Sequence, residues 1–497
     1  MTSIVLTLSS ALLYVILRFK KINFESVSVE ELIFLIFSPT TGANIENFRQ
    51  DITDSLLPFV FAITVMIIPI IVGYFLYVKK DKTDNVIGRE VKKSIGSYMF
   101  LYSFCLFMIS ASYTVQQLQL PRYLVNQFTN TELYEEYYTD PETAQISVPD
   151  KKRNLIVIYM ESMENTLGSK RNGGANDISK IPELEAIALD PQNVSFSNTE
   201  QLGGAQPVFA TTWTAAGLTS MTTGVPLVPT ADIDTNDFGK LPKYLPGAYG
   251  IGEILEKNGY NQSVMFGSEA SFGGRNNLYK QHGNYNVYDL ITARESGIIP
   301  EDYKVWWGFE DEKLFAYAKS KITKLGESDR PFNFQFLTAD THFSDGYLEP
   351  TCPTPYDTQY DNVYACSSLQ ISRFLDWLSQ QPFYENTTVV LTGDHLGMQT
   401  DFYEAVMPVG YTRTIYNAFI NPVNKPSKEN NRTFTSLDLY PTILSSIGIT
   451  SDQNRLGLGT DLFSDRDTIA EEIGIGKLDQ ELSRRSKFYT DTIMNGQ

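Results

Sequence analysis

The chain has 497 residues, of which 42% are hydrophobic and 13% aromatic, so it is long enough for membrane segments plus one large folded domain and too apolar to be mainly disordered. Its formal net charge of −18 argues against a nucleic-acid partner, because contacts along a phosphate backbone need clustered Lys and Arg. An anionic small substrate remains compatible with this charge, because a bound cation can reverse the local field.

Two N-terminal segments predict membrane spans. Residues 55–78 and 94–115 carry no charged side chain over 24 and 22 residues, enough to cross a hydrocarbon core of about 30 Å. Residues 3–17 are shorter and predict a third span; a signal peptide is the alternative, but the segment lacks a basic start and a small-residue cleavage site. We therefore expect about three spans within residues 1–115, placed in a lipid bilayer.

The connection between the two longer spans is strongly basic. Six cations lie in it: Lys79, Lys80, Lys82, Arg89, Lys92 and Lys93. By the positive-inside rule this loop is cytoplasmic, so everything after about residue 116 lies outside the cytoplasm of a multi-pass inner or plasma membrane protein. In that part we expect an interfacial connector at 116–150, an extracytoplasmic catalytic domain at 151–465 and a helical tail at 466–497.

From residue 154 onwards, short apolar runs alternate with helical patterns. Strands are predicted at residues 154–160, 260–266, 332–338, 388–393 and 414–420. Helices are predicted at residues 251–259, 311–325, 368–381 and 436–448. The alternation predicts an α/β fold with a mostly parallel sheet flanked by helices, preceded by transmembrane helices.

The segment VFATTWTAAGLTS, residues 208–220, lies in a stretch from 201 to 231 without any charged side chain. Of its hydroxyls, Thr214 precedes residues that can start a helix, where backbone N–H groups attract a phosphate. Thr211 and Thr212 are the alternatives. Three later threonines fall further into the helix and are expected to pack or cap: Thr219, Thr222 and Thr223.

Acidic and imidazole groups follow three of the predicted strands. They are Glu161 after the first strand, Asp340, Thr341 and His342 after the third, and Asp394 and His395 after the fourth. Ligands of open α/β sheets bind beyond the carboxyl ends of the strands, so these groups are expected at one edge. Glu161, Asp394 and His395 are donors suited to a divalent cation such as Mn, Mg or Zn. Such a cation can lower the pKa of a threonine hydroxyl without a neighbouring base. Helix capping and a purely structural Asp–His pair are the alternative interpretations.

Two of the three cysteines, Cys352 and Cys366, lie in the predicted outer part, where oxidation is allowed. They predict a disulfide that closes a short loop, with two free buried thiols as the alternative. Cys105 lies within a predicted span.

Several separate motifs resemble those of the phosphoglycerol transferases of the alkaline phosphatase/sulfatase superfamily. They are NLIVIYMES, TWTAAG, GGRNNLYKQHG, WWGFEDEKLF, TADTHFSDG and TGDHLGM, in this order along residues 150–465. The sequence is most similar to the osmoregulated-glucan glycerophosphotransferases and then to the lipoteichoic acid synthases. The cysteines in EPTCPTPYD and VYACSSLQ also resemble a pair in the glucan-type enzymes.

The resemblance implies a role for each matching residue. Thr214 would be the nucleophile, and the metal ligands would be Glu161, Thr214, Asp394 and His395. Arg275 and His342 would bind the phosphoglycerol group. The glucan-type enzymes have a long C-terminal extension outside the similar region, so the acceptor stays open between a glycan and a teichoic-type polyglycerolphosphate.

Histidine content separates members of this superfamily. The chain has three histidines, His282, His342 and His395, whereas a two-zinc phosphatase site draws on several His and Asp together. One divalent metal is therefore expected, Mn first, with Mg and Zn as alternatives. His282 is interpreted as either substrate-side or structural. Sulfatases mature a Cys or Ser to formylglycine, and TWTAAG offers neither at that position.

The expected function is therefore transfer of phosphoglycerol from phosphatidylglycerol to an extracytoplasmic acceptor through a covalent threonine intermediate. Two alternatives remain at this point. One is a phosphoethanolamine transferase, which also uses a threonine and a metal. The other is a catalytically inactive, membrane-anchored protein that binds or senses glycans.

Overall fold

The computed structural model describes residues 2–23, 49–81, 86–229, 238 and 242–497. Contacts between Cα atoms group them into two units, one that ends at Val125 and one that continues from Asn126 to Gln497. Each unit is described by itself.

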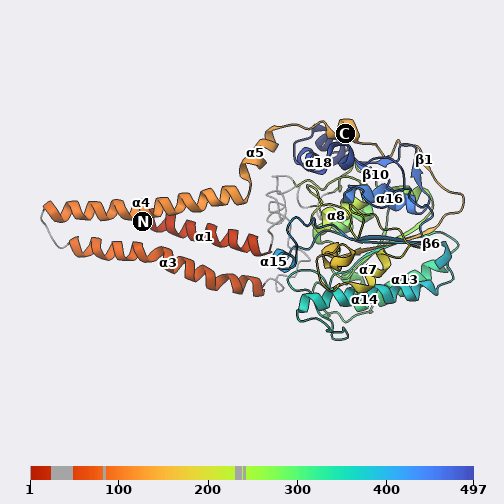
Figure 1. The fold of residues 1–497 in the computed structure, drawn as a ribbon, viewed down its shortest axis with the longest axis horizontal. Coiled ribbons are helices and arrows are strands. Elements are labelled where there is room, and N and C mark those ends of the chain that lie inside the picture. The colour runs from red at the N-terminus through yellow and green to blue at the C-terminus, as the bar shows by residue number, and fades with distance from the viewer. Residues whose placement is uncertain (1, 24–48, 82–85, 230–237, 239–241) are drawn as a thin grey trace. The chain divides into compact units, whose positions relative to one another are not determined.

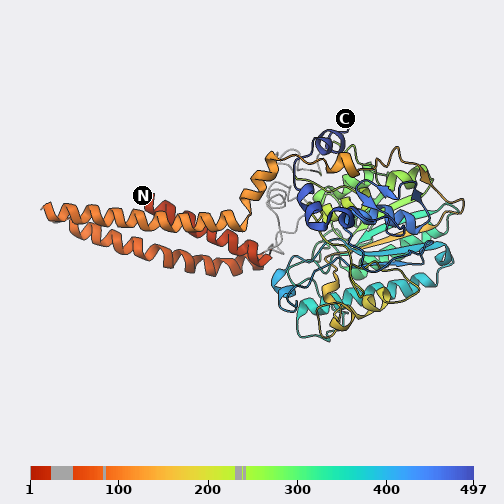
Figure 2. The ribbon, with the colours of Figure 1, turned by 45° about the horizontal axis from the view of Figure 1, so that its top comes forward.

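The first unit is built from three long helices. Helices α1 (Thr2–Asn23), α3 (Arg49–Asp81) and α4 (Val86–Gln117) run alongside one another (Figure 2). Within them, Leu57–Lys79 and Glu90–Gln117 are long and apolar enough to cross a membrane, and the apolar stretch Thr2–Arg18 of α1 is shorter. A buried hydrogen bond of 3.2 Å from the Thr7 hydroxyl to the Ser103 hydroxyl links α1 to α4. Such polar contacts join helices that cannot rely on the hydrophobic effect inside lipid.

A six-stranded sheet forms the centre of the second unit. Its strands are β2 (Asn154–Met160), β3 (Asn261–Phe266), β4 (Asn286–Tyr288), β5 (Phe332–Leu337), β6 (Thr387–Gly393) and β7 (Asn417–Ile420). They follow the order β4-β3-β5-β2-β6-β7, and all neighbours are parallel except β6 and β7. The prediction of an α/β fold with a mostly parallel sheet is confirmed.

Strand β2 lies at the middle of the core because every one of its residues is buried. Ile156 pairs with Phe334 of β5 on one side and with Val389 of β6 on the other. Apolar residues on both faces of a strand require cover on both faces. Helices α7 (Pro182–Ala188), α13 (Asp311–Gly326) and α14 (Gln359–Ser379) cover one face, and α8 (Thr214–Thr223) and α16 (Leu439–Ser446) the other (Figure 1).

Shorter elements complete the second unit. The remaining helices are α5 (Leu120–Phe128, which starts in the first unit), α6 (Leu133–Tyr137), α10 (Ile251–Lys257), α11 (Arg275–Gln281), α12 (Leu290–Glu295), α15 (Thr400–Glu404), α17 (Ile469–Ile473) and α18 (Ile475–Leu482). Strand β1 (Ile146–Ser147) pairs with β8 (Thr450–Ser451), and β9 (Arg455–Leu456) pairs with β10 (Gly459–Thr460).

The bounds of several predicted elements differ from those observed, and the contacts explain two of the differences. The strand predicted at 414–420 is limited to β7, because Ile415 and Tyr416 donate instead to the carbonyls of Ala205 and Met163. The helix predicted at 368–381 starts at Gln359, where the Thr358 side chain accepts the N–H of Asp361 as an N-cap.

The expected connector and tail contact each other. The Asn126 side chain donates to Ser483 Oγ at 2.8 Å, and the Thr131 hydroxyl donates to Glu481 Oε2 at 2.8 Å. The ring of Tyr134 stacks on that of Phe488, with 6.0 Å between the centroids. The residues after 466 therefore pack as part of the second unit, against the segment that leads into it.

A disulfide joins Cys352 to Cys366, whose Cα atoms are 5.5 Å apart. It ties the loop before α14 to the first half of that helix. By chain entropy, closing a loop of this length stabilises a fold by about 3 kcal/mol.

We expect the double substitution Cys352→Ala/Cys366→Ala to lower the free energy of unfolding of the second unit by about 3 kcal/mol, because the unfolded chain regains the loop entropy. Urea unfolding followed by tryptophan fluorescence measures this, since all four tryptophans of the chain lie in the second unit. Cys105→Ala, in the first unit, is the control. An unchanged urea midpoint in the double variant would contradict the prediction.

Candidate active site

The groups predicted to follow the strands meet at the carboxyl edge of the sheet. Glu161 comes directly after β2, and Asp394 and His395 come directly after the neighbouring parallel strand β6. One ligand atom from each of these residues lies within 4.8 Å of the others. His395 Nε2 is 3.4 Å from Glu161 Oε1 and 3.4 Å from Asp394 Oδ2. We refer to Glu161, Asp394 and His395 as the acid–imidazole trio.

Thr214 is the first residue of α8, and its hydroxyl lies against the trio. Its Oγ1 is 3.4 Å from Glu161 Oε2 and 3.3 Å from His395 Nε2. The hydroxyl of Thr211 is directed elsewhere, because it donates to the Val208 carbonyl at 2.8 Å. Thr212 lies before the N-cap residue Trp213. The later threonines of the helix each donate to a carbonyl four residues earlier: Thr219, Thr222 and Thr223.

Gly217 brings α8 close enough to the strand ends for this contact. A Cβ atom at this position would lie 2.1 Å from the carbonyl oxygen of Asp394, a separation that no side chain can tolerate. The backbone of α8 therefore packs directly on the backbone that carries Asp394. The sequence contains a signal for this approach, the final glycine of TWTAAG, but a glycine in a helix does not by itself reveal its neighbour.

The trio is removed from water, since Glu161, Asp394 and His395 are 2%, 0% and 1% exposed. Burial and then the charge of Glu161 raise the pKa of Asp394 to about 7. Burial also acts to raise the pKa of Glu161, but the positive potentials of His342 and His395 and the hydrogen bond from Ser162 outweigh it and lower the pKa. Two carboxyl groups therefore compete to be ionised in one small volume.

The donor set fits a divalent cation. In the described part of the chain, the buried atom Asp394 Oδ2 accepts no hydrogen bond, whereas Oδ1 accepts from the N–H groups of Ser162 and His395 at 2.9 Å each. His395 Nδ1 donates to the Leu396 carbonyl at 2.8 Å, which leaves the lone pair on Nε2, the atom that faces Thr214. Metal-binding histidines show this arrangement, and carboxylate plus imidazole suits Mn, Mg or Zn.

Arg275 is at the start of α11 and is held in place by its own hydrogen bonds. Its Nε donates to the Phe272 carbonyl at 3.0 Å, and Nη2 donates to Ser268 Oγ at 3.0 Å and to the Glu269 carbonyl at 2.7 Å. These bonds do not use Nη1. Burial lowers the pKa of Arg275 to about 10, so the guanidinium remains charged at neutral pH.

His342 follows β5 and is fixed on both sides. Its Nδ1 donates to the Phe343 carbonyl at 2.7 Å, and its ring lies 4.4 Å from the Trp307 ring, centroid to centroid. Burial lowers the pKa of His342. Both His342 and Arg275 interact electrostatically with Glu161, so both predicted phosphoglycerol-binding residues lie at the same edge as the trio.

His282 has a structural environment. Its Nδ1 is 2.6 Å from Glu253 Oε1, and its Nε2 is 2.6 Å from the Tyr244 carbonyl. Burial acts to lower the pKa of His282, but the hydrogen bond and charge of Glu253 outweigh it and raise the pKa. Of the two interpretations of this residue, the contacts support the structural one.

Comparison with known proteins identifies the family of this chain. The profile of the sulfatase family matches residues 153–449, more than half of the chain. The chain belongs to the sulfatase family.

The chain is similar to phosphoglycerol transferase I of Escherichia coli (strain 55989 / EAEC), with 29% identity over 332 residues. That match covers 65% of this chain, and the chain spans about 40% of the length of the curated relatives that it matches. A solved alkaline phosphatase superfamily protein from Vibrio parahaemolyticus has a TM-score of 0.49 at 20% identity, covering 67% of this chain and 76% of that one. The lipoteichoic acid synthase LtaP from Listeria monocytogenes has a TM-score of 0.49 at 17% identity, covering 67% and 81%.

A buried ion pair in this sulfatase-family domain supports the segment after His395. Glu164 Oε1 accepts from Arg413 Nε at 2.9 Å, and Glu164 Oε2 accepts from the N–H of Gly397 at 2.9 Å. The side chains of Glu164 and Arg413 are 0% and 13% exposed. The guanidinium also lies 4.1 Å from the centroid of the Tyr403 ring. The sequence alone does not reveal this pair, because Arg413 is separated from Glu164 by more than half of the domain.

The C-terminal tail supports the segment that carries Thr214. Asp479 Oδ1 accepts from the N–H of Phe209 at 2.9 Å, and the Tyr489 hydroxyl donates to the Pro226 carbonyl at 2.7 Å. Residues on both sides of the candidate nucleophile are therefore held by the last part of the chain, a role that the pattern of the tail does not indicate.

We expect Arg413→Met to lower the free energy of unfolding of the second unit by about 3–5 kcal/mol, because it leaves the buried Glu164 carboxylate without its partner. The double variant Glu164→Met/Arg413→Met should cost less than Arg413→Met alone, since no unpaired charge remains. Urea unfolding followed by tryptophan fluorescence tests both statements. A double variant that is less stable than the single one would show that the charge pair itself, rather than the unpaired carboxylate, controls stability.

Proposed function

We propose that the chain is a membrane-anchored, metal-dependent transferase that moves a phosphoglycerol group from phosphatidylglycerol to an extracytoplasmic glycan or polyglycerolphosphate acceptor, through a covalent intermediate on Thr214. One observation carries the proposal: the Thr214 hydroxyl is 3.3 Å from His395 Nε2 and 3.4 Å from Glu161 Oε2, at the first residue of a helix. Membership of the sulfatase family and the similarity to proteins named phosphoglycerol transferase I support it.

The residues proposed to hold the cation are Glu161, Thr214, Asp394 and His395, with Mn as the first choice and Mg or Zn as alternatives. A divalent cation bound there would lower the pKa of the Thr214 hydroxyl and offset negative charge that develops on the phosphate oxygens. Two observations support this choice: the trio is buried, and the lone pair of His395 Nε2 faces Thr214.

In the first half-reaction, Thr214 Oγ1 forms a bond to the phosphorus of phosphatidylglycerol, and the bond from phosphorus to the diacylglycerol oxygen breaks. The proton lost by the threonine hydroxyl ends on the diacylglycerol. In the second half-reaction, the oxygen of an acceptor hydroxyl forms the new bond to phosphorus and the bond from phosphorus to Thr214 Oγ1 breaks. The proton of the acceptor hydroxyl ends on Thr214 Oγ1. Positioning and electrostatic stabilisation contribute most of the rate in such transfers.

Arg275 and His342 are proposed to bind the phosphoglycerol group. Arg275 Nη1 is not used by the hydrogen bonds that fix the side chain, so it can donate to a phosphate oxygen while the rest of the guanidinium stays anchored. His342 Nδ1 donates to the Phe343 carbonyl, so the ring proton is on Nδ1 and Nε2 is an acceptor. We propose that Nε2 accepts a hydrogen bond from a glycerol hydroxyl.

The proposed location follows from the substrate. A phospholipid donor is held in a bilayer, and the chain contains two helical stretches long and apolar enough to cross one, Leu57–Lys79 and Glu90–Gln117. The basic connection between them favours the cytoplasmic side, which leaves the sulfatase-family domain outside the cytoplasm.

We expect the full chain, freed of metal with a chelator, to bind one Mn²⁺ per chain. Asp394→Asn and His395→Ala should each weaken this binding by at least about 100-fold, because each removes a donor from a buried set of three. Isothermal titration calorimetry measures the affinity without any need for turnover. Glu301→Gln, an exposed acid, is the control. Equal affinity in Asp394→Asn and the unchanged chain would exclude the trio as the metal site.

We expect incubation with phosphatidylglycerol and Mn²⁺ to leave a phosphoglycerol adduct on Thr214, detected by mass spectrometry of tryptic peptides. Thr214→Ala should abolish the adduct, whereas Thr212→Ala should keep it, because only the former removes the hydroxyl that contacts the trio.

The same experiment distinguishes the alternatives. An adduct from phosphatidylethanolamine instead would identify a phosphoethanolamine transferase, and an adduct on another hydroxyl of residues 208–220 would relocate the nucleophile. Absence of any adduct or diacylglycerol release, together with absence of metal binding, would support the inactive glycan-binding alternative.

A further inference from the structure

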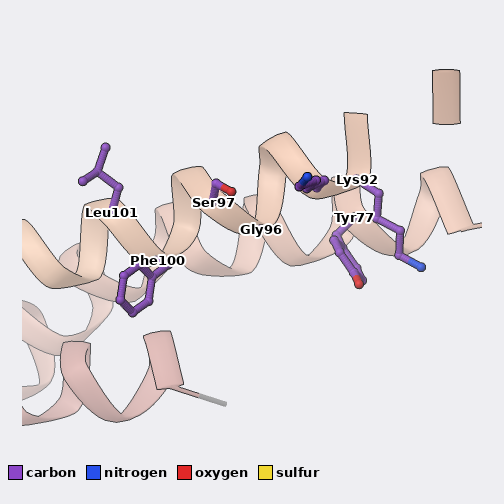
Figure 3. Close-up of a pocket in the computed structure, with 7 residues that line it drawn as sticks. Tyr77, Lys92, Gly96, Ser97, Phe100 and Leu101 are labelled. Atoms are coloured by element: carbon purple, nitrogen blue, oxygen red, sulfur yellow. The ribbon is translucent and has the colours of Figure 1, made fainter. Parts of the chain in front are cut away.

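A groove lies between α3 and α4 in the first unit. It has a volume of about 800 Å³ and is lined by Tyr77 of α3 and, among others, by Lys92, Lys93, Gly96 and Phe100 of α4. Figure 3 shows Tyr77 and Lys92 towards one end of the groove and Phe100 and Leu101 towards the other. The groove is thus basic and hydroxyl-bearing at one end and apolar at the other.

The basic end is organised by a contact between the two helices. The ammonium of Lys92 lies 4.6 Å from the centroid of the Tyr77 ring, which places the cation beside α3 rather than out in solvent. Among the described residues that line the groove, two are cations and none is acidic. A second groove between the same helices, of about 560 Å³, is lined by Glu90 and contains no lysine. The positive charge is therefore specific to one groove.

The position along the helices matches the edge of a bilayer. Tyr77 lies two residues before Lys79, the end of one apolar stretch, and Lys92 lies two residues after Glu90, the start of the other. Phe100 and Leu101 follow Lys92 by eight and nine positions and are 47% and 59% exposed. At 1.5 Å per residue this corresponds to about 12 Å, the distance from a phosphate to the upper part of an acyl chain.

Gly96 leaves room in the middle of the groove. A Cβ atom built at this position meets nothing within 4 Å, so the space between the basic and apolar ends is open. A phosphate headgroup could therefore lie at the lysines while its acyl chains pass over Gly96 to Phe100.

We propose that this groove is a binding site for an anionic phospholipid, with the headgroup phosphate at Lys92 and Lys93 and an acyl chain along Gly96, Phe100 and Leu101. The lipid comes from the leaflet next to the basic connection, residues 79–93. Basic pockets between transmembrane helices bind anionic headgroups in this way. The inference rests on the proposed membrane anchoring but not on the transfer reaction, since it assigns a resident lipid and not the donor that meets Thr214.

The test uses the full chain in phosphatidylcholine vesicles that contain a small proportion of phosphatidylglycerol with a photoreactive diazirine in its headgroup. After irradiation, peptide mass spectrometry locates the adducts. Adducts are expected within residues 77–101. Lys92→Gln/Lys93→Gln should reduce them by about 25-fold, because each lysine near an anionic lipid contributes about fivefold in binding.

Two matched substitutions test the shape of the groove. Gly96→Phe fills it without changing charge and should abolish the adducts, and a phenylalanine costs little in a helix that had glycine. Ser94→Phe adds the same bulk to the second groove and should leave the adducts unchanged. Lys425→Gln/Lys428→Gln, two exposed lysines of the second unit, controls for the loss of two charges.

The proposal is overturned if Lys92→Gln/Lys93→Gln leaves the adducts at 77–101 unchanged, or if a phosphatidylcholine with the same diazirine labels these residues equally. Adducts of the donor at the acid–imidazole trio fall on different peptides. If the unchanged chain shows adducts at residues 77–101 but none near the trio, that result would contradict the proposed transfer reaction and still support the lipid site.

Discussion

The main constraint on the second unit is that it holds two carboxyl groups and one imidazole together out of water. Glu161 and Asp394 lie at the ends of neighbouring parallel strands, and burial, followed by the charge of Glu161, raises the pKa of Asp394 to about 7. Buried like charges are unfavourable unless a positive charge compensates them. The geometry is therefore maintained by the sheet, by the close approach at Gly217 and by the Glu164–Arg413 pair, and it is suited to a divalent cation.

Helix α14 connects the disulfide to this site through hydroxyl groups. The Tyr360 hydroxyl donates to the Thr341 carbonyl at 2.8 Å, and the Thr341 hydroxyl donates to the Glu161 carbonyl. On the next turn, the Tyr364 hydroxyl lies 2.6 Å from that of Tyr403, whose ring packs on Arg413. Cys366 lies two residues further along the same helix. The disulfide is therefore attached to the helix whose tyrosine hydroxyls contact the loops after β2 and β5.

The sequence predicts the centre of this unit well because the relevant signals are local. Strand β2 has the predicted bounds because its seven uncharged, mostly apolar residues lie between Arg153 and Glu161. Glu161, Asp394 and His395 each follow a parallel strand, which implies that they meet at one edge of the sheet. What could not be predicted depends on contacts distant in sequence. Strand β4 has three residues and little pattern of its own, Ser162 adopts a positive φ of 55° at the end of β2, and Arg413 finds Glu164 only after folding. Helix position favours Thr214 over Thr211 in the sequence, but the hydrogen bond that directs the Thr211 hydroxyl to the Val208 carbonyl is visible only in three dimensions.

The charge of the chain also explains why a membrane anchor suits the proposed reaction. A net charge of −18 repels an anionic lipid surface, so long-range attraction would not bring the chain to the proposed lipid donor. Attachment to the bilayer replaces that attraction, because it fixes the donor at a high local concentration regardless of charge. Local positive potential is then needed only where the phosphate reacts, and Arg275, buried and still cationic, supplies it beside the proposed metal site. The lysines of the proposed lipid groove belong to the first unit and Arg275 belongs to the second, so the two proposed phosphate contacts use different cations of an acidic chain.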